Sequence, residues 1–434
     1  MKDNTIVALS TPPGRGAIAV VRMSGGRAKE IAGKIFSSMP KEPNTLKVGK
    51  ISLDGFSDRA MLVFFDAPRS YTGEDTVEFH CHGGAGVAGE LIRKCISLGA
   101  RTAVNGEFSK RAFLNGKQNL SNAEGIIQMI DAESRLALKA GENLMSGRLG
   151  KLTAKIQDEL TDVIAECEAA LDYPEEDLDV LSRGQIYCKL SEIYGSLNRL
   201  AFSAETGRII SGGVNIAIVG NTNVGKSSLL NALLGSERAI VTDIAGTTRD
   251  TLKESIIFKD AKFNFIDTAG LRKTEDYVEK LGIDRAQRAA EQADLVLNVV
   301  EGGGETVKTD KPVIIVRNKM DKIKTDGICL KENEIWVSAL YGTNIEELKQ
   351  KIYDKFSLGS VGQDDTILTN ARHADCVENA KRFVKNALDA LDTTTLDCVT
   401  AEVRNAWNTL GLITGATASE EIIDRIYEKF CLGK

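Results

Sequence analysis

The chain has 434 residues, of which 42% are hydrophobic and 27% charged, and its formal net charge is −6 at pH 7. That length predicts roughly two to four domains, and the negative charge excludes a protein whose whole surface binds nucleic acid, so any RNA contact must come from a local basic patch or a partner. No apolar run is long enough to cross a membrane, no signal region is recognisable, and the eight cysteines form no CxxC pair, so we expect a cytoplasmic protein with reduced thiols and no membrane partner.

Residues 1–118 have the mixed pattern of an α+β domain. Strands are predicted at four apolar runs, Ile6–Leu9, Ala17–Arg22, Met61–Phe65 and Thr76–His82. A Gly83-Gly84 break precedes a helical pattern that ends near Leu98. Five of the seven prolines lie in the first 68 residues, which predicts a change of architecture after this domain.

The pattern becomes helical over residues 119–211. Ser121 and Glu124 are spaced as a capping box, in which the serine would begin a helix. Apolar residues recur at spacings of three and four from Leu149 to Leu171, which predicts one long helix that ends at Tyr173-Pro174. A further helix is predicted from about residue 183 to about residue 205.

Residues 212–362 alternate between short apolar runs and helical segments, which predicts a parallel, doubly wound sheet. The runs are Ile216–Val219, Phe263–Ile266, Leu295–Val300, Val313–Val316 and Ile335–Val337. Helical patterns return in residues 363–434. Neither helical block looks able to form a domain by itself. We therefore predict that the two blocks pack together as one discontinuous domain into which the α/β domain is inserted.

A phosphate-binding loop is predicted at Gly220–Ser227, which spells G-x-x-x-x-G-K-S between an apolar strand and a helical stripe. Backbone N–H groups of such a loop surround the β-phosphate, while Lys226 reaches the β and γ oxygens and Ser227 holds Mg²⁺. The alternative, a chance glycine-rich turn, does not account for the flanking strand and helix. The predicted contacts are Asn223, Val224, Gly225, Lys226, Ser227 and Ser228, with Lys226 also a catalytic candidate.

The base is predicted to be guanine. Asn318-Lys319-Met320-Asp321 fits N-K-x-D directly after an apolar strand. In that motif the aspartate accepts hydrogen bonds from guanine N1–H and the exocyclic amine, a pattern that adenine does not offer. Ser338 and Ala339 follow the next strand and are spaced as a loop whose backbone contacts guanine O6.

Two short motifs complete the predicted GTP site. Asp267 and Gly270 belong to D-T-A-G, in which the aspartate binds Mg²⁺ through water and the glycine amide contacts the γ-phosphate. Upstream, Thr247 and Thr248 lie in G-T-T-R-D, where Thr248 would reach the metal. Leu271 stands where Ras-like enzymes carry the glutamine that positions the attacking water, so another polar group must orient the water, and an arginine or a cation must supply charge.

These motifs together resemble the MnmE (TrmE) family of tRNA modification GTPases. The resemblance extends over the whole chain, through Thr11–Gly16, Ser70–Asp75, His82–Gly84, Gly106–Ser109, Arg111–Asn115, Gly220–Ser228, Ile240–Asp250, Asp267–Arg272 and the C-terminal Cys431-Leu-Gly-Lys434.

The resemblance implies a homodimer formed through the N-terminal domains, with G domains that meet when GTP and K⁺ bind. It implies K⁺ coordination by Asn223 and by the loop that holds Thr242, Ile244 and Thr247, in the place of an arginine finger. Glu279 matches the family's water-orienting glutamate. The alternative for Glu279 is one exposed helix carboxylate among several.

The resemblance also implies that the N-terminal domain binds 5-formyltetrahydrofolate. The matching positions are Arg22, Glu78, Lys117 and Lys434, although each also fits an ordinary strand or surface position. Cys431 is a candidate nucleophile near the folate, with a purely folate-covering tail as the alternative. His80 and His82 share one strand face, but two ligands without a third are weak evidence for a metal, so a packed or hydrogen-bonded pair is favoured.

The expected function is that of a K⁺-stimulated GTPase. With the FAD-dependent partner MnmG (GidA), in a heterotetramer or larger assembly, it would form 5-carboxymethylaminomethyl or aminomethyl uridine at the tRNA wobble position, using a folate one-carbon unit. The alternative is a regulatory GTPase switch, for example in ribosome assembly, that acts only through partner binding. A scaffold with an inactive G domain is disfavoured by Lys226, Ser227, Thr248 and Asp267.

Overall fold

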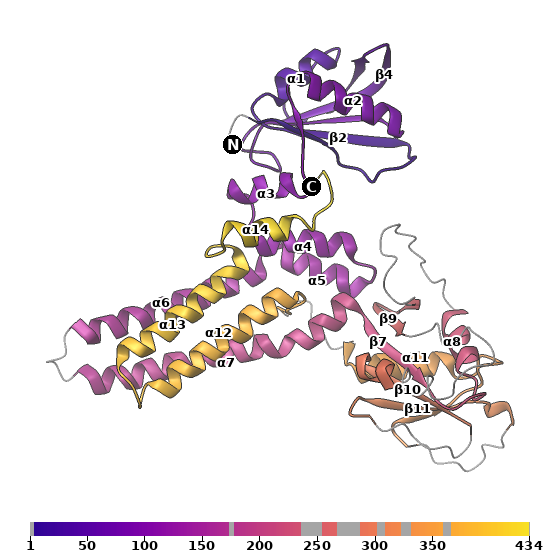
Figure 1. The fold of residues 1–434 in the computed structure, drawn as a ribbon, viewed down its shortest axis with the longest axis vertical. Coiled ribbons are helices and arrows are strands. Elements are labelled where there is room, and N and C mark those ends of the chain that lie inside the picture. Colours follow the sequence, from indigo (N-terminus) through magenta and orange to yellow (C-terminus); the bar gives the residue numbers. More distant parts are fainter. Residues whose placement is uncertain are drawn as a thin grey trace. The chain divides into compact units, whose positions relative to one another are not determined.

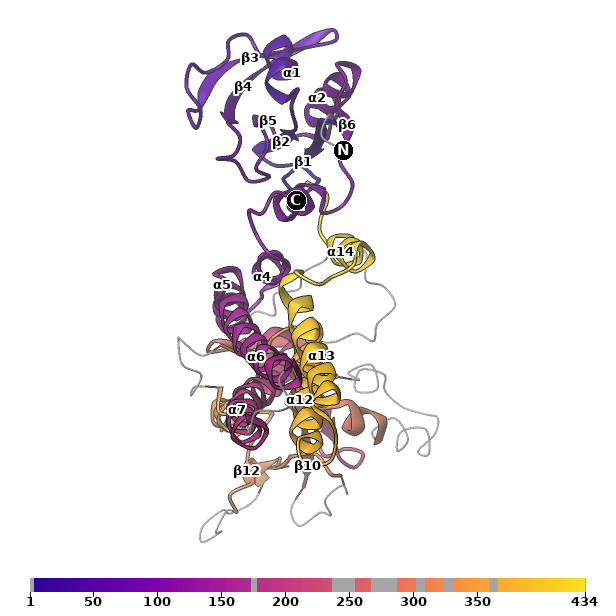
Figure 2. The same cartoon turned by 90° about the vertical axis from the view of Figure 1, so that its left-hand side faces the viewer.

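The computed structural model describes residues 4–172, 178–235, 254–266, 287–301, 309–322, 331–358 and 366–433 (Figures 1 and 2). The chain forms two compact units. The first comprises Met1–Ile127, Leu144–Ile193 and Arg382–Lys434, and the second comprises Gln128–Asn143 and Tyr194–Lys381. Within the described ranges, no helix is long and apolar enough to span a membrane.

A six-stranded mixed sheet forms the N-terminal part of the first unit, with strand order β3-β4-β5-β2-β1-β6. Its strands are β1 Ile6–Leu9, β2 Ile18–Ser24, β3 Lys47–Leu53, β4 Phe56–Phe65, β5 Thr76–His82 and β6 Arg101–Thr102. Helices α1 Ala28–Ile35 and α2 Ala85–Ser97 pack on one face, where Val21, Met23 and Phe79 are fully buried. The α+β prediction for this region is confirmed.

Strands β3 and β6 were not predicted, and each has a physical reason for lacking a sequence signal. In β3 only Ile51 and Leu53 are buried, because the strand lies at the edge of the sheet and exposes most of its side chains. Strand β6 has only two residues, which pair in parallel with Ile6 and Val7 of β1. Neither strand carries the apolar pattern that identifies a buried strand from sequence.

Helix α3 Glu107–Leu114 covers part of the opposite sheet face, where Phe108 packs with Ile6, Ala8 and Ala103. The helices that follow on either side of the second sheet in the sequence are α4 Leu120–Asp131, α5 Arg135–Met145, α6 Arg148–Asp172, α7 Leu178–Gly212, α12 Ala371–Ala390, α13 Leu396–Thr414 and α14 Glu420–Tyr427. Helices α6 and α13 lie side by side in both views (Figures 1 and 2), and the Gln157 side chain donates a 3.0 Å hydrogen bond to the Trp407 carbonyl. The predicted packing of the two helical blocks is therefore confirmed.

The predicted capping box at Ser121 is wrong. Helix α4 already begins at Leu120, and the Asn119 side-chain oxygen accepts 2.8 Å hydrogen bonds from the backbone N–H of Asn122 and from the Ser121 hydroxyl. Asparagine is as good an N-cap as serine. The helix therefore begins earlier than the Ser-x-x-Glu spacing indicated, and Ser121 is buried in its first turn.

The second unit holds a six-stranded sheet of order β12-β11-β10-β7-β9-β8. Its strands are β7 Val214–Val219, β8 Glu254–Phe258, β9 Ala261–Ile266, β10 Leu295–Val300, β11 Val313–Arg317 and β12 Glu334–Trp336, and helices α8 Lys226–Gly235 and α11 Ile345–Lys355 pack with it. All pairings are parallel except that of β8 with β9. The parallel sheet is confirmed, with the unpredicted β8 as an antiparallel edge strand.

Helix α7 packs very closely on the chain that returns from this sheet. The backbone N–H of Leu368 donates a 3.1 Å hydrogen bond to the Ser203 hydroxyl, and Leu368 is 1% exposed. An added Cβ at Gly207 would lie 2.0 Å from the Leu368 carbonyl oxygen. A residue without a side chain is therefore required at this point of the helix.

We predict that Gly207→Ala destabilises the protein, whereas Gly195→Ala in the same helix does not. Overpacking against backbone typically costs about 1–3 kcal/mol. An added Cβ at Gly195 would meet only the end of the flexible Arg199 side chain, at 3.9 Å. Alanine should therefore stabilise the helix there by roughly 1 kcal/mol, because its helix propensity is higher than that of glycine. Thermal unfolding followed by circular dichroism should show a lower Tm for the first variant and an equal or higher Tm for the second. Shifts of the same sign would contradict the close contact.

Candidate functional site

The phosphate-binding loop connects β7 to α8. Val219 ends the strand and Lys226 begins the helix, so the N-terminal N–H groups of α8 point into the loop. Gly225 has φ +94°, and an added Cβ would lie 2.2 Å from the Asn318 side-chain nitrogen. Only glycine fits there, which explains the second glycine of the motif.

Lys226 is half-buried at the start of α8, and its ammonium group lies over the loop. Its Nζ donates hydrogen bonds to the carbonyls of Gly220, at 2.9 Å, and Asn221, at 2.7 Å. Burial lowers the pKa of this ammonium group, because desolvation disfavours its charged form. The lysine therefore stands where it can exchange carbonyl partners for the oxygens of a phosphate.

Asn318 joins the three loops that the sequence assigned to GTP. Its side chain is 2% exposed. Its Nδ2 donates a 2.9 Å hydrogen bond to the Val224 carbonyl in the phosphate loop, and its Oδ1 accepts a 3.0 Å hydrogen bond from the Ala339 backbone N–H. The N-K-x-D motif, the phosphate loop and the Ser338-Ala339 loop are thus tied together through one buried amide.

Asp321 is exposed beside this junction, in a single 3₁₀ turn, Met320–Lys322. The buried Ser338 hydroxyl donates a 2.6 Å hydrogen bond to one Asp321 carboxylate oxygen. Lys319 forms an ion pair with Glu301. The carboxylate is therefore oriented by Ser338, which sequence reasoning had linked to guanine only through its backbone.

The rest of the predicted GTP and ion site is only partly described. Asn223 is exposed with φ +62°, and Ser227 and Ser228 are exposed in the first turn of α8. The other predicted residues lie outside the described ranges: Thr242, Ile244, Thr247, Thr248, Asp267, Gly270 and Glu279.

The N-terminal candidate site centres on an ion pair. Arg22 of β2 and Glu78 of β5 are direct partners in the antiparallel register, and the Arg22 Nε lies 2.8 Å from a Glu78 oxygen. Both side chains are mostly buried, at 19% and 16% exposure. The Arg22 guanidinium carbon lies 5.3 Å from the Tyr71 ring centre and 5.8 Å from that of Phe108, distances at which aromatic rings attract a cation.

Sequence reasoning missed Tyr71 and Phe108 as parts of this site. The Tyr71 hydroxyl lies 2.7 Å from the Ser109 hydroxyl, so a hydrogen bond fixes the ring. Both aromatic residues belong to motifs that carry the family resemblance, Ser70–Asp75 and Gly106–Ser109. The sequence signal that could have identified them is an aromatic residue within a motif of otherwise small or polar residues.

Lys117 and the C-terminal tail approach the same region by different routes. Lys117 donates a 3.0 Å hydrogen bond to the Pro68 carbonyl, in the segment that leads to Tyr71. Cys431 is exposed, and the Ser10 hydroxyl donates a 3.1 Å hydrogen bond to the Gly433 carbonyl. Lys434 lies outside the described residues.

The two histidines of β5 each pair with a carboxylate. His80 lies 3.4 Å from Glu78, and His82 lies 2.5 Å from Asp58. Burial of Asp58 opposes ionisation, but hydrogen bonds from the His82 backbone and ring outweigh it and lower the pKa of the carboxyl. No cluster of three or more potential metal ligands occurs among the residues that the structure describes.

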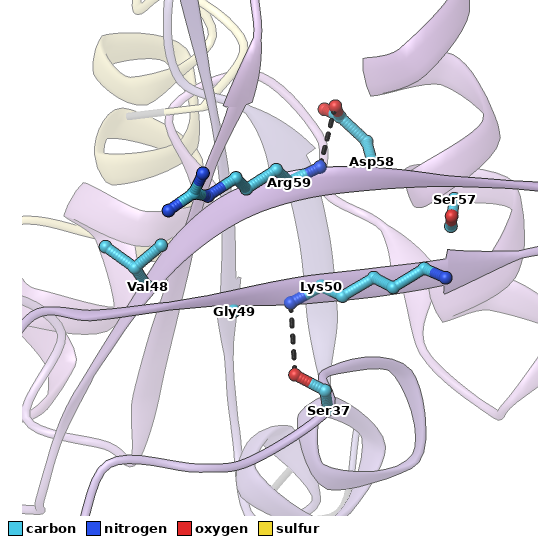
Figure 3. A pocket seen from close by; sticks show the side chains of 7 residues that line it. All are labelled: Ser37, Val48, Gly49, Lys50, Ser57, Asp58 and Arg59. Carbon is cyan, nitrogen blue, oxygen red and sulfur yellow. Dashed lines mark hydrogen bonds between the residues drawn. The ribbon is translucent and has the colours of Figure 1, made fainter.

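A separate pocket of about 530 Å³ lies on the hairpin of β3 and β4 (Figure 3). The Lys50 backbone N–H donates a 3.0 Å hydrogen bond to Ser37, and the Arg59 backbone N–H donates a 2.8 Å hydrogen bond to Asp58. The Lys50 and Arg59 side chains point in opposite directions along the hairpin in Figure 3. None of the residues predicted from sequence lines this pocket.

Comparison with known proteins places these sites in a family. Residues 5–117 match the profile "GTP-binding protein TrmE N-terminus", and residues 120–431 match "MnmE helical domain". A tRNA modification GTPase MnmE of Clostridioides difficile (strain 630) is 38% identical over 456 residues, covering 100% of this chain and 99% of the relative. That of Acetivibrio thermocellus is 38% identical over 457 residues and covers 100% of both chains.

The solved G domain of the T. maritima FeoB iron transporter is 25% identical with a TM-score of 0.25, and covers 33% of this chain and 98% of that one. The family assignment comes from the full-length relatives and from the two profiles, which together span the described N-terminal sheet, the helices and the nucleotide loops. The chain therefore belongs to the MnmE (TrmE) family of tRNA modification GTPases.

Proposed function

We propose that this chain hydrolyses GTP in the modification of tRNA, through a K⁺-stimulated G domain and a folate-binding N-terminal domain. The observation that carries the GTP assignment is the Asn318 amide, which bonds to both Val224 and Ala339. These two hydrogen bonds hold the phosphate loop and the Ser338-Ala339 loop together, which supports a guanine subsite next to a phosphate subsite. No such arrangement is expected from a chance glycine-rich turn.

The chain's own residues divide the work at the nucleotide. Backbone N–H groups of the loop and of α8 bind the β-phosphate, and Lys226 moves from its carbonyl partners to the phosphate oxygens. Asp321, oriented by Ser338, accepts the two donors of the guanine edge. Ser227 and Thr248 would hold Mg²⁺, with Asp267 binding it through water, and the ion would supply positive charge to the phosphates. Glu279 is proposed to orient the attacking water, since Leu271 has no polar group.

K⁺ is proposed to bind at Asn223, Thr242, Ile244 and Thr247, where its charge replaces that of an arginine finger. Support comes from Asn223, which has a left-handed backbone conformation and an exposed side chain. Its amide oxygen has no hydrogen-bond partner in the described parts of the chain. Asparagine tolerates this backbone region better than most residues do. An amide oxygen is also a suitable ligand for a hard cation.

A tetrahydrofolate, 5-formyltetrahydrofolate in particular, is proposed to bind at Arg22 and Glu78, with Lys117 and Lys434 as further contacts and Cys431 nearby. The carboxylate suits the amino and N–H donors of a pterin, while the cations suit carboxylates of a glutamyl tail. The rings of Tyr71 and Phe108 beside Arg22 provide an apolar boundary for a planar ligand. The folate would supply a one-carbon unit to uridine.

The assembly and domain limits follow the family resemblance. We propose an N-terminal domain of residues 1–118 that binds folate and dimerises, a helical domain of residues 119–211 and 363–434, and a G domain of residues 212–362. A homodimer is proposed to act in the cytoplasm with the FAD-dependent enzyme MnmG on the wobble uridine. A regulatory GTPase switch, which would share the G-domain motifs, is distinguished by its lack of folate binding.

We predict that GTP turns over faster in K⁺ than in Na⁺ at equal ionic strength, and that Asn223→Gly loses most of this difference. Glycine tolerates the positive φ of Asn223 and removes the side chain with its amide oxygen. Steady-state phosphate release measures turnover, and a fluorescent GDP analogue checks that nucleotide affinity changes less than about threefold. Equal rates of the unmodified chain in the two salts would refute the role of K⁺.

We predict that Asp321→Asn weakens GTP binding by about 10- to 100-fold and strengthens XTP binding. The amide replaces one of the two acceptors that guanine needs with a donor, which suits the O2 of xanthine, and one charge-assisted hydrogen bond corresponds to about 1.5–3 kcal/mol. Titration calorimetry with both nucleotides tests this. Asp310→Asn, an exposed acid of the same unit, controls for the change in net charge, and an unchanged GTP affinity in Asp321→Asn would exclude the guanine contact.

We predict that Glu78→Gln lowers the affinity for 5-formyltetrahydrofolate at least tenfold and leaves GTP hydrolysis unchanged. The variant keeps the shape of the side chain but removes the charged acceptor. Glu90→Gln is the matched control, because Glu90 also pairs with an arginine, Arg93, on the surface of α2. Binding is measured by equilibrium dialysis. If the unmodified chain does not bind the folate, the regulatory-switch hypothesis is favoured instead.

A further inference from the structure

The first turn of α5 lies against the hairpin that β8 and β9 form. Helix α4 ends at Asp131 and α5 begins at Arg135, and we call residues 132–136 the α4–α5 corner. The hairpin turns at Lys259-Asp260, between β8 and β9. All of these residues belong to the second unit. Backbone, apolar and ionic contacts join the corner to the hairpin.

The backbone contact completes the beginning of α5. The first four N–H groups of a helix have no acceptor within the helix. The Ser134 hydroxyl accepts one of them, in a 3.2 Å hydrogen bond from Ala137, as an N-cap residue does. The Leu136 N–H instead donates a 3.1 Å hydrogen bond to the Asp260 carbonyl. The turn of the hairpin therefore supplies an acceptor that α5 itself lacks.

The apolar and ionic contacts lie next to this hydrogen bond. The Leu136 side chain is 6% exposed and packs in the apolar cluster that holds Phe258 of β8 and Phe263 of β9. The Lys262 ammonium group of β9 lies 2.8 Å from the Glu133 carboxylate, and these side chains are 22% and 38% exposed. Both strands of the hairpin thus contribute to the contact with the corner.

Helix α11 holds the same turn through a side chain. The Tyr353 hydroxyl donates a 2.7 Å hydrogen bond to the Asp260 carboxylate. Burial and this hydrogen bond raise the pKa of Tyr353 to about 12, so the hydroxyl remains a donor at neutral pH. The Lys259 ammonium group lies 5.0 Å from the centre of the Tyr353 ring. A displacement of the hairpin must therefore carry the corner along or break its contacts.

The other end of the hairpin leads to two motifs of the predicted nucleotide site. In the sequence, Gly246–Asp250 shortly precedes β8, and Asp267 directly follows β9. Strand β8 is at the edge of the sheet and pairs only with β9 among the described strands, so fewer hydrogen bonds fix it than fix an inner strand. In GTPases, contacts with the γ-phosphate and Mg²⁺ order such motifs, and hydrolysis releases them. Nucleotide exchange is therefore expected to displace the hairpin.

We propose that the β8–β9 hairpin transmits the nucleotide state to α5, with Leu136 and Glu133 as the positioning residues that receive the displacement. The proposal rests on the proposed GTP hydrolysis and adds a route out of the nucleotide site. Such coupling is reciprocal, because a contact that is stronger in one nucleotide state favours that nucleotide. Breaking the contact should therefore change the ratio of the GDP and GTP affinities, which a purely structural contact would leave unchanged.

The test uses the full chain with GDP or with GppNHp, a GTP analogue that resists hydrolysis. Glu133→Lys places two cations together, and the double variant Glu133→Lys/Lys262→Glu restores an ion pair of reversed polarity. Glu378→Lys is the matched control, because Glu378 pairs with Lys381 within α12 of the same unit. Mass spectrometry measures hydrogen exchange of the Leu136 amide, and titration calorimetry measures the ratio of the two nucleotide affinities.

In the unmodified chain, we expect the Leu136 amide to exchange at rates that differ severalfold between the two nucleotides. Glu133→Lys should speed this exchange about fivefold, because the hydrogen bond opens more often once the ion pair is lost and two cations repel each other. The same variant should shift the affinity ratio severalfold. The double variant should recover both quantities, and Glu378→Lys should behave as the unmodified chain.

Equal exchange rates with GDP and GppNHp, in an unmodified chain that hydrolyses GTP, would overturn the transmission alone. Faster exchange in Glu133→Lys with an unchanged affinity ratio would overturn it as well, since the contact would then be purely structural. Without recovery in the double variant, the ion pair has no part in it. A chain that binds neither nucleotide would refute the proposed function and the transmission together, while the charge exchange still decides whether the hairpin holds the corner.

Discussion

The nucleotide site depends on the buried side-chain amide of Asn318. Its donor and its acceptor are both used, by Val224 and Ala339 respectively, and the side chain is 2% exposed. Leaving a buried polar group without its partner costs about 1–3 kcal/mol. Moving either loop away from Asn318 would carry this cost, so this one side chain fixes the separation of the two loops. The same amide also lies against Gly225, where an added Cβ would be 2.2 Å from its nitrogen. The asparagine of N-K-x-D therefore fits in this position only because the second glycine of the phosphate loop has no side chain.

The N-terminal motifs that carry the family resemblance are also held together by a few hydrogen bonds and ion pairs. Glu74, from Ser70–Asp75, accepts a 2.8 Å hydrogen bond from Arg111 and a 2.9 Å hydrogen bond from Ser24. Arg111 also pairs with Glu107 at 3.0 Å, and several partners hold the pKa of that carboxyl below its ordinary value despite its burial. These charged residues bind one another and Ser24, and they hold the segment that carries Tyr71 next to Arg22. The motifs therefore describe a network that supports this segment.

Sequence reasoning succeeded where function depends on neighbouring residues along the chain. A strand, a glycine-rich loop and a helix within about 20 residues identify the phosphate loop, and N-K-x-D is recognisable because it directly follows β11. The sequence did not reveal contacts made across long separations, such as Ser10 with Gly433, or ring contacts such as that of Tyr71 with Arg22. The Asn119 cap was missed for a different reason, since two adequate capping residues, Asn119 and Ser121, stand two positions apart in the sequence.

The two candidate sites share one physical arrangement. In each, a segment whose glycine adopts a positive φ carries a side chain suited to chemistry, Lys226 in one and Cys431 in the other, and a polar side chain from a distant part of the chain holds that segment by its backbone carbonyl. Asn318 does this to Val224, and Ser10 does it to Gly433. A glycine segment loses much conformational entropy on being ordered, so a single hydrogen bond of about 1 kcal/mol holds it only together with the close packing around it. The backbone of the phosphate loop is ordered in this way, while the Lys226 side chain makes separate hydrogen bonds to the Gly220 and Asn221 carbonyls, which it would exchange for phosphate oxygens.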